Sequence, residues 1–499
     1  MMKFERMSGV FLHPTSLAGR YGIGSLGDEA YQFIDFLAGA GQKLWQICPL
    51  GPTGYGDSPY QCFSAFAGNP MLISLERLVE DGLLNEEDLE VDIEFDKDIV
   101  EYGKVIDFKM PLFKKAFGKF SSIGDKDDFR AFCEQNAEWL DDYALFRAVK
   151  STFNERPWNE WDEDIKLREE AAVAKYKKEL AEEIEFRSFI QYLFFKQWTD
   201  VREYANNKNI QIVGDIPIFV AMDSADAWAN PEVFYFDEDM KPTKVAGVPP
   251  DYFSETGQLW GNPLYNWDKL RESNYQWWVK RIEALLEVAD IVRIDHFRGF
   301  AAYWAVPYGE KTAINGEWEK APGIELFKTI KDELGELPII VEDLGLITKD
   351  VKELKDTFDF PGMEILQFAF DAEEGNNITP DQYTTDNCVV YTGTHDNNTT
   401  LGWYKEDASK ADRKMLEDYL DKHLDYRHDS IVWDLIELAW SSRAVISLVT
   451  LQDVLELGSE ARFNTPGVLG GNWDWKYRPE MLTEDRMLAL KEMTERNNR

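Results

Sequence analysis

The sequence predicts an α/β protein built on a (β/α)8 TIM barrel with inserted subdomains, and three observations lead to this class. Short apolar, β-branched runs recur eight times, and each ends in a polar or charged residue before a loop. Helical segments fill the gaps between the runs. From Glu342 to Asp396, two steps from strand to strand take 54 residues, or about 27 each, which is close to the roughly 30 residues of a β/α unit. Two other gaps are much longer. Eight such units in a row would close into a parallel barrel.

Each run has the character of a strand that is buried on both faces. Continuous apolar segments, without alternation of polar and apolar residues, are typical of parallel strands covered by helices. The expected strands lie at residues 10–13, 43–49, 210–215, 291–295, 339–343, 363–370, 388–396 and 444–453. Residues 274–287, just before the fourth run, are one of the segments expected to be helical.

The two long gaps predict insertions in a single catalytic barrel that spans residues 1–499. Residues 79–195 are expected to form a mostly helical insertion, because apolar side chains such as Phe129, Trp139 and Phe146 recur at helical spacings. Residues 219–270 are rich in Pro, Gly and Trp and are expected to form an insertion beside the substrate cleft. Linkers, repeats and low-complexity tracts are not evident.

The charge balance excludes several classes of partner. The chain has 54 Lys and Arg against 92 Asp and Glu, a formal net charge of −38. Such a surface repels phosphate backbones and anionic lipid headgroups, so we expect neither nucleic acid nor a membrane surface as a partner. Hydrophobic residues make up 44% of the chain, which is enough for a large core rather than disorder. The sequence makes no prediction of the oligomeric state.

Cysteine usage and the N-terminus favour a cytoplasmic protein. Cys48 and Cys388 lie in apolar runs, and none of the four cysteines has C-x-x-C spacing, so we expect reduced thiols. The first residues contain Glu5 and lack the apolar segment of a signal peptide. The chain also lacks an apolar stretch of about 20 residues that would cross a membrane.

Carboxylates stand at the ends of four of the expected strands. They are Asp215, Asp295, Glu342 and Asp396, and Arg293 precedes Asp295 by two residues, on the same face of its strand. A single Asp at a loop start most often caps the next helix. Because the carboxyl ends of barrel strands meet at one mouth, four carboxylates in this position favour a functional site.

Two chemistries use such a cluster. Carboxylates can hold Mg²⁺ beside an acid–base group, or two of them can serve as nucleophile and proton donor in glycoside chemistry. Arg293 favours the second, because a neighbouring cation should lower the pKa of Asp295 and keep it ionised. Glu342 would then need a raised pKa from burial and from Asp343 and Asp396. His395, next to Asp396, suits a donor to sugar hydroxyls, although alone it could be an ordinary loop histidine.

Aromatic and amide side chains in the predicted loops agree with a sugar ligand. Flat aromatic faces suit the C–H faces of pyranoses, and amides suit their hydroxyls, but any one of these residues could equally be loop core. The aromatic candidates are Tyr55, Tyr60, Trp228, Tyr252, Phe253, Trp260 and Trp267, and the polar candidates are Gln61, Asp251, Gln258, Asn262, Asn397 and Asn464.

Several segments together resemble one known family over nearly the whole chain. The chain is similar to 4-alpha-glucanotransferases of the amylomaltase or disproportionating-enzyme type, glycoside hydrolase family 77. The motifs lie at residues 13–16, 51–66, 214–220, 246–263, 293–299, 341–345, 392–397, 462–467 and 471–473. Phe219, Asn398 and Glu364 depart from the usual pattern and bear at most on preference among substrate chains.

The resemblance implies retaining, two-step transfer on α-1,4-glucans and maltooligosaccharides, with glucose as an acceptor, and it implies neither a metal nor a cofactor. It also implies a barrel without the C-terminal β-domain of amylases. By the resemblance, Asp295 is the nucleophile, Glu342 the acid/base and Asp396 the stabiliser of the transition state. The remaining expected site residues are Arg293, His395, Tyr60, Asp251, Gln258, Trp260, Asn464 and Asp215. Arg293 would orient Asp295, His395 would bind the sugar, Asp215 would have a supporting role, and residues 251–260 would form a covering loop.

Three other activities remain open. A hydrolase of the same clan would use the same carboxylates, a metal-dependent barrel enzyme would need a cation, and a non-catalytic glucan-binding protein would be expected to lack one carboxylate. This chain keeps all three carboxylates, Asp295, Glu342 and Asp396.

Overall fold

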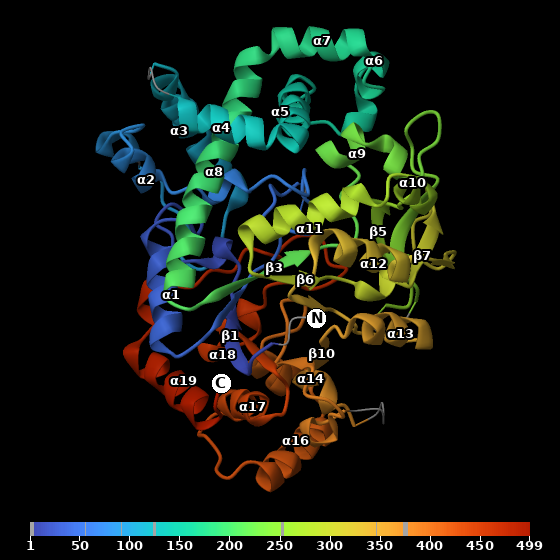
Figure 1. Ribbon diagram of the computed structural model, residues 1–499. Coiled ribbons are helices and arrows are strands. Elements are labelled where there is room, and N and C mark those ends of the chain that lie inside the picture. The colour runs from blue at the N-terminus through green and yellow to red at the C-terminus, as the bar shows by residue number, and fades with distance from the viewer. Residues whose placement is uncertain are drawn as a thin grey trace.

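The structure is a computed structural model that describes residues 4–54, 56–90, 92–122, 126–250, 254–345, 347–372 and 378–499. Figure 1 shows strands enclosed by helices, with α5, α6 and α7 at one end of the molecule and α16 at the other. Within the described part of the chain, none of the helices combines the length and the apolar character that crossing a membrane requires.

Eight parallel strands form the barrel, and each of the eight predicted runs overlaps one of them. The strands are β1 Met7–Phe11, β2 Leu44–Gln46, β3 Gln211–Ile216, β6 Ile291–Ile294, β9 Ile339–Val341, β10 Gly362–Ile365, β11 Cys388–Tyr391 and β12 Ile446–Thr450. Their order is β10-β11-β12-β1-β2-β3-β6-β9. The N–H of Val341 donates to the carbonyl of Pro361 at 3.0 Å and joins the two ends of this order. The predicted fold class is confirmed.

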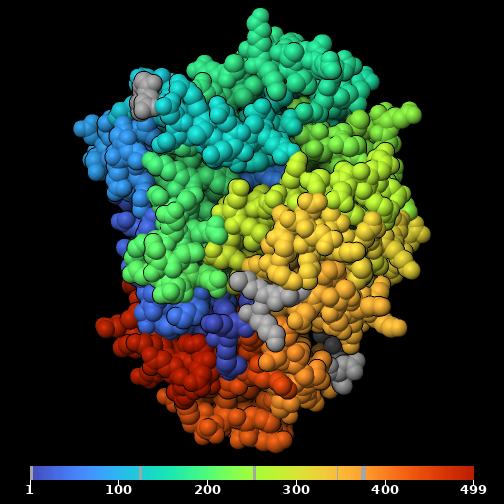
Figure 2. All heavy atoms as spheres, viewed as in Figure 1, coloured from blue at the N-terminus to red at the C-terminus, as the bar shows by residue number. Residues whose placement is uncertain are grey.

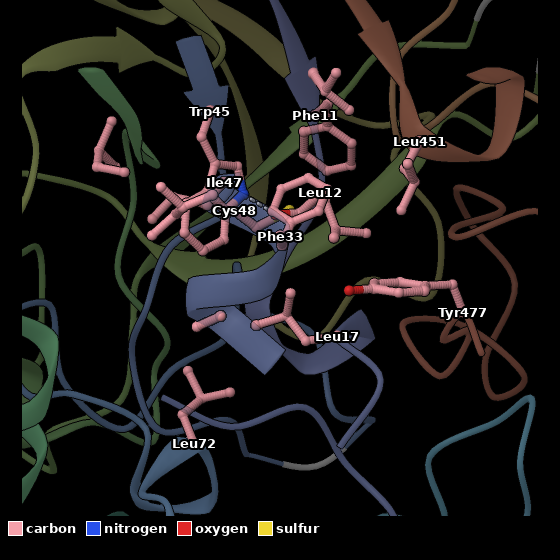
Figure 3. Close-up of a cluster of buried hydrophobic side chains, with 14 of the residues drawn as sticks. Phe11, Leu12, Leu17, Phe33, Trp45, Ile47, Cys48, Leu72, Leu451 and Tyr477 are labelled. Carbon is pink, nitrogen blue, oxygen red and sulfur yellow. Dashed lines mark hydrogen bonds between the residues drawn. The ribbon is translucent and has the colours of Figure 1, made fainter. Parts of the chain in front are cut away.

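The strands are buried on both faces, as their apolar runs predict. Leu44, Val213 and Ile340 belong to a cluster contributed by the barrel strands, while neighbouring residues such as Trp45 pack outward against helices. The indole of Trp45 meets the ring of Phe33 edge to face at 5.3 Å and donates to the carbonyl of Leu12 at 2.8 Å. Figure 3 shows these side chains gathered between the strands and the helix that carries Phe33.

Helices of the barrel layer follow most of the strands. They include α1 Asp28–Gly39, α11 Gln276–Val288, α12 Gly323–Leu334, α13 Lys349–Phe358, α16 Lys410–His423, α17 Ile431–Ser441 and α19 Glu484–Arg496. Shorter helices are α9 Ala225–Ala229, α10 Trp267–Glu272, α14 Leu366–Ala369, α15 Thr400–Gly402 and α18 Leu451–Val454. In helix α12, Leu326, Phe327 and Ile330 are buried at helical spacing, and they place this helix against the barrel.

The chain between β2 and β3 is mostly helical. It contains α2 Leu75–Glu80, α3 Tyr102–Ser121, α4 Asp127–Gln135, α5 Ala137–Thr152, α6 Glu163–Lys166, α7 Glu170–Glu179 and α8 Ala181–Asn207. Helix α8 packs against α3, α4 and α5 at one end and against α1 at the other, so it ties these helices to the barrel. In Figure 2 the green surface of this segment and the orange and red surface of the C-terminal part form opposite ends of the molecule. The boundaries 79–195 and 219–270 stay predictions.

A second sheet was not predicted. Its strands are β4 Lys244–Val248, β5 Gln258–Pro263, β7 Ala302–Pro307 and β8 Glu317–Lys320, in the order β5-β4-β7-β8. All three pairings are antiparallel. Because β4 and β5 come before β6 in the chain and β7 and β8 after it, the sheet gathers segments from both sides of the Asp295 strand.

Candidate active site

The four carboxylates lie where their strands end. Asp295 directly follows β6, Glu342 directly follows β9, Asp215 is near the end of β3, and Asp396 lies in the turn after β11. In a parallel barrel the carboxyl ends of all strands open on the same side, so the fold brings these four residues to one mouth.

Arg293 and Asp215 form a buried ion pair that supports Asp295. The parallel pairing of β3 with β6 sets Asp215 opposite Arg293. The Nη1 of Arg293 donates to Oδ2 of Asp215 at 2.5 Å and to Oδ1 of Asp295 at 3.0 Å. The side chains of Asp215 and Arg293 are 1% and 3% exposed, but that of Asp295 is 25% exposed. Asp295 is therefore the member of this group that can meet a ligand.

The electrostatics of Asp295 differ from the expectation. Burial raises the pKa of Asp295 above its ordinary value, and the charges of Asp215 and Asp396 add to this increase. Arg293 acts in the expected direction and lowers the pKa, but it pairs with Asp215 as well. One guanidinium serving two carboxylates does not outweigh burial, so the predicted net decrease is wrong.

Glu342 is held at both of its carboxylate oxygens. Oε2 accepts the N–H of His296 at 2.8 Å, and Oε1 accepts the N–H of Leu344 at 2.8 Å. Burial is the main cause that raises the pKa of Glu342, and the nearby charge of Asp295 is the next. The hydrogen bond from Leu344 and the charge of Arg293 act in the opposite direction without cancelling the increase. The expected increase in pKa is present, and a carboxyl group of this kind can keep a proton to donate.

Asp396 is kept ionised by its neighbours. Its Oδ1 accepts the Nδ2 of Asn464 at 2.6 Å, and its Oδ2 lies 3.3 Å from Nε2 of His395. Burial alone would raise the pKa of Asp396, but the charge of His395 and the hydrogen bonds from His395 and Asn464 lower it to about 2. Its side chain is 47% exposed, so a charged group faces the open side of the site.

The imidazole of His395 is enclosed by aromatic rings. Tyr60 stacks on it with ring centres 5.3 Å apart, and Phe11 does so at 5.5 Å. Burial lowers the pKa of His395, but Asp396 outweighs burial and raises it overall. The hydroxyl of Tyr60 donates to Oδ2 of Asp215 at 2.8 Å, so Tyr60 links the imidazole to the buried ion pair of Arg293 and Asp215. Trp473 completes the enclosure, with its ring 5.8 Å from that of His395.

Trp260 and Gln258 lie on β5, at the edge of the second sheet. The indole Nε1 of Trp260 donates to Oε1 of Gln258 at 3.2 Å. Its ring meets that of His296 edge to face at 4.8 Å, next to the Asp295 strand. This contact brings the predicted covering segment to the site. Asp251, Tyr252 and Phe253, which belong to that segment, lie outside the described residues, as does Tyr55.

Some of the residues that were predicted to face a ligand lie in the core or bond within the loops instead. Trp228 in α9 and Trp267 in α10 are 1% and 5% exposed and belong to the core, because short helices that were expected as loops turn them inward. Gln61 donates to Asn262 at 3.1 Å, and Asn397 accepts from the backbone of Thr394 at 2.9 Å, so these amides serve the loops themselves.

Sequence reasoning missed three residues of the site. Phe11 ends an apolar strand and is indistinguishable from core in the sequence. His296 donates from its backbone and packs its ring on Trp260, and its signal is its place in the family motif at residues 293–299. Trp473 does carry a signal, because it stands in one of the family motifs. Among the described residues, no group of three His, Cys, Asp or Glu side chains is arranged to hold a metal ion.

Comparison with known proteins identifies the family. The family model for 4-alpha-glucanotransferases, glycoside hydrolase family 77, matches residues 12–483. A 4-alpha-glucanotransferase of Synechocystis sp. is 51% identical over 96% of this chain and 95% of its own length, and one of Thermus thermophilus is 49% identical over 99% and 100%. The amylomaltase of Streptococcus agalactiae, solved in complex with acarbose, superposes with a TM-score of 0.95 at 42% identity and covers 99% of this chain and all of its own. This chain belongs to the 4-alpha-glucanotransferases of glycoside hydrolase family 77.

Proposed function

We propose that this enzyme moves a segment of an α-1,4-glucan to the 4-hydroxyl of another glucan or of glucose, and that Asp295, Glu342 and Asp396 carry out the chemistry. The observation that carries the proposal is the contrast between their environments. Asp295 is bonded to Arg293, Glu342 has a pKa raised by burial and by Asp295, and Asp396 has a pKa lowered to about 2. Such a separation supports the roles of nucleophile for Asp295, proton donor for Glu342 and permanent anion for Asp396.

In the first step, the carboxylate of Asp295 attacks the anomeric carbon of the donor glucan. A bond forms between this carbon and an Asp295 oxygen, and the bond to the glycosidic oxygen breaks. Glu342 gives its proton to that oxygen, so the reducing-end fragment leaves as an alcohol. Asp396 faces the positive charge that develops on the sugar, and His395 donates to a sugar hydroxyl beside it.

In the second step, the 4-hydroxyl of an acceptor attacks the same anomeric carbon. Glu342, now ionised, takes the proton of this hydroxyl, and the bond to Asp295 breaks. Two inversions retain the α configuration. Because one α-1,4 bond is made for each one broken, the reaction is close to thermoneutral.

Transfer outcompetes hydrolysis when an acceptor sugar, rather than water, occupies the site next to the glycosyl-enzyme. The ring of Trp260 beside His296 provides an apolar platform for a sugar at this point. Excluding water in this way is one means by which an enclosed site directs a reactive intermediate. We place the enzyme in the cytoplasm, which agrees with its four free cysteines.

Products from maltotriose distinguish transfer from hydrolysis. We expect glucose together with oligosaccharides longer than maltotriose, detected by chromatography from the first minutes of reaction. Maltose and glucose alone would contradict the proposal and indicate a hydrolase of the same clan. The Asp295→Asn variant, incubated in parallel, controls for contaminating glucosidases.

A further inference from the structure

The barrel closes at β9 and β10, and Glu342 lies at this closure. The sheet order begins at β10 and ends at β9, so these two strands are its ends. They are joined by the backbone bond from the N–H of Val341 to the carbonyl of Pro361. Glu342 is the next residue after Val341, so it directly follows the bond that closes the barrel.

Asp343 bridges this closure with its side chain. Its Oδ1 accepts the N–H of Met363 in β10 at 2.8 Å, and its Oδ2 accepts the Nζ of Lys355 in α13 at 2.6 Å. The side chain is 8% exposed. A carboxylate thus accepts from the β10 backbone in the place where a neighbouring strand would offer a carbonyl.

Gly362 leaves the room that this carboxylate needs. A Cβ atom added at Gly362 would lie 2.4 Å from Oδ2 and 2.5 Å from Oδ1 of Asp343. Both distances are far below van der Waals contact, so any side chain at Gly362 would displace Asp343. Gly362, which has no side chain, therefore leaves the space that the carboxylate of Asp343 fills.

The backbone around Glu342 is consequently fixed from two sides. Toward β6, the N–H of Glu342 donates to the carbonyl of Ile294 at 2.9 Å, and its carbonyl accepts from Phe297 at 3.0 Å. Toward β10 and α13, Asp343 supplies the anchors. Leu344, whose N–H holds the Glu342 carboxylate, is the next residue along the chain.

We propose that Asp343 is a positioning residue, which aims the carboxyl group of Glu342 by anchoring the backbone of residues 342–344 to β10 and α13. The inference rests on the proposed role of Glu342 as acid/base. Since a carboxyl group misplaced by about 1 Å can lower a rate about a hundredfold, the anchor matters for turnover more than for binding.

Two variants test the anchor in different ways. Asp343→Asn keeps an oxygen for Met363 but loses the charge that holds Lys355, and Gly362→Ala displaces the carboxylate while its charge remains. We expect each to lower kcat at least about tenfold, which is about 1.4 kcal/mol of barrier, with little change in KM. Asp343→Ala, which removes both anchors, should be slower than Asp343→Asn.

The pH profile separates positioning from loss of stability. The charge of Asp343 contributes to the raised pKa of Glu342, so Asp343→Asn should move the alkaline limb of kcat/KM to lower pH, whereas Gly362→Ala should leave it nearly in place. Glu364→Gln is the matched control, because it removes a carboxylate whose charge acts on Asp343 and Lys355 and leaves both hydrogen bonds of Asp343 intact. Its kcat should stay near that of the wild type.

Two results would overturn the inference. In the first, the kcat of Asp343→Asn stays within about twofold of the wild-type value. In the second, kcat falls only in proportion to the unfolding free energy measured in urea. Glu342→Gln shows whether the proposed function itself has failed. An inactive Glu342→Gln with an active Asp343→Asn refutes only the anchor. An active Glu342→Gln refutes the role of Glu342 on which the anchor depends.

Discussion

Arg293 serves two carboxylates with one guanidinium nitrogen. Its Nη1 lies 2.5 Å from Asp215 and 3.0 Å from Asp295, and only Asp295 reaches the open side of the site. Burial is the main cause that raises the pKa of Asp295, and Arg293, which also pairs with Asp215, does not reverse this increase. This arrangement fixes the direction of the Asp295 carboxylate and does not make it more acidic.

At the residue scale, the nucleophile can be identified directly. Asp295→Asn should fold normally and lose more than about a thousandfold of transfer activity, because the amide cannot form the covalent intermediate. A fluorinated maltosyl donor should trap the wild-type enzyme, and peptide mapping should find the sugar on Asp295. Asp268→Asn removes an exposed carboxylate and should be fully active. Label on another carboxylate would show that the nucleophile is misassigned.

The pH profile of kcat/KM should report Glu342. In the proposed mechanism, turnover needs Glu342 protonated, and a raised pKa keeps that proton to higher pH. The alkaline limb should therefore lie well above the ordinary glutamic value of about 4.3. Asp295 must be ionised, and its raised pKa places the acidic limb above the ordinary aspartic value of about 3.9. Initial rates measured from pH 4 to 9 check both limbs, and activity that already falls as the pH is raised through about 5 would contradict the assignment of Glu342.

At the element scale, continuous apolar runs predicted all eight barrel strands, because burial on both faces leaves a signal that needs no partner. The second sheet gave no such signal. Its outer strand, Glu317–Lys320, is charged at three of four positions and is defined by its pairing with β7. For the same reason, the carboxylates were predicted from their places after strands, whereas the pairing of Asp215 with Arg293 depends on the register of β3 and β6. Register and pairing come from the folded chain, not from local composition.

Helix α8 holds the loop that carries Tyr60 through two buried glutamines. The amide of Gln191 accepts from the N–H of Gly68 at 2.7 Å and donates to its carbonyl at 2.9 Å. Gln197 makes the same pair of bonds with Ser74, at 2.7 and 3.2 Å. Each glutamine thus imitates one residue of a neighbouring strand.

Removing one of these amides should be costly. Gln191→Leu keeps the volume but leaves a buried N–H and carbonyl of Gly68 without partners, and we expect a loss of about 1–3 kcal/mol in unfolding free energy. Urea unfolding followed by tryptophan fluorescence measures it. On the exposed face of the same helix, Glu203→Ala should change stability by less than about 0.5 kcal/mol. Equal effects of the two variants would show that the hydrogen bonds of Gln191 contribute little to stability.

At the scale of the whole molecule, the charge of −38 has two components. Most of the acids are spread over the surface, where mutual repulsion opposes compaction and keeps molecules apart. A few stand at strand ends and are held in place by Arg293, His395 and backbone N–H groups. A neutral glucan is neither attracted nor repelled by this field, so the enzyme can carry a strong surface charge without slowing substrate capture.

Salt should therefore affect stability and catalysis differently. Screening extends over about 10 Å at 0.1 M salt and shortens as salt is added, so repulsion between surface acids weakens. The unfolding free energy should rise between 20 and 500 mM NaCl, while kcat/KM for maltotriose should change by less than about twofold, since the substrate is uncharged. Initial rates and urea unfolding in the same buffers make the comparison. A fall in kcat/KM of about tenfold or more, with stability unchanged, would mean that long-range charge contributes to substrate capture after all.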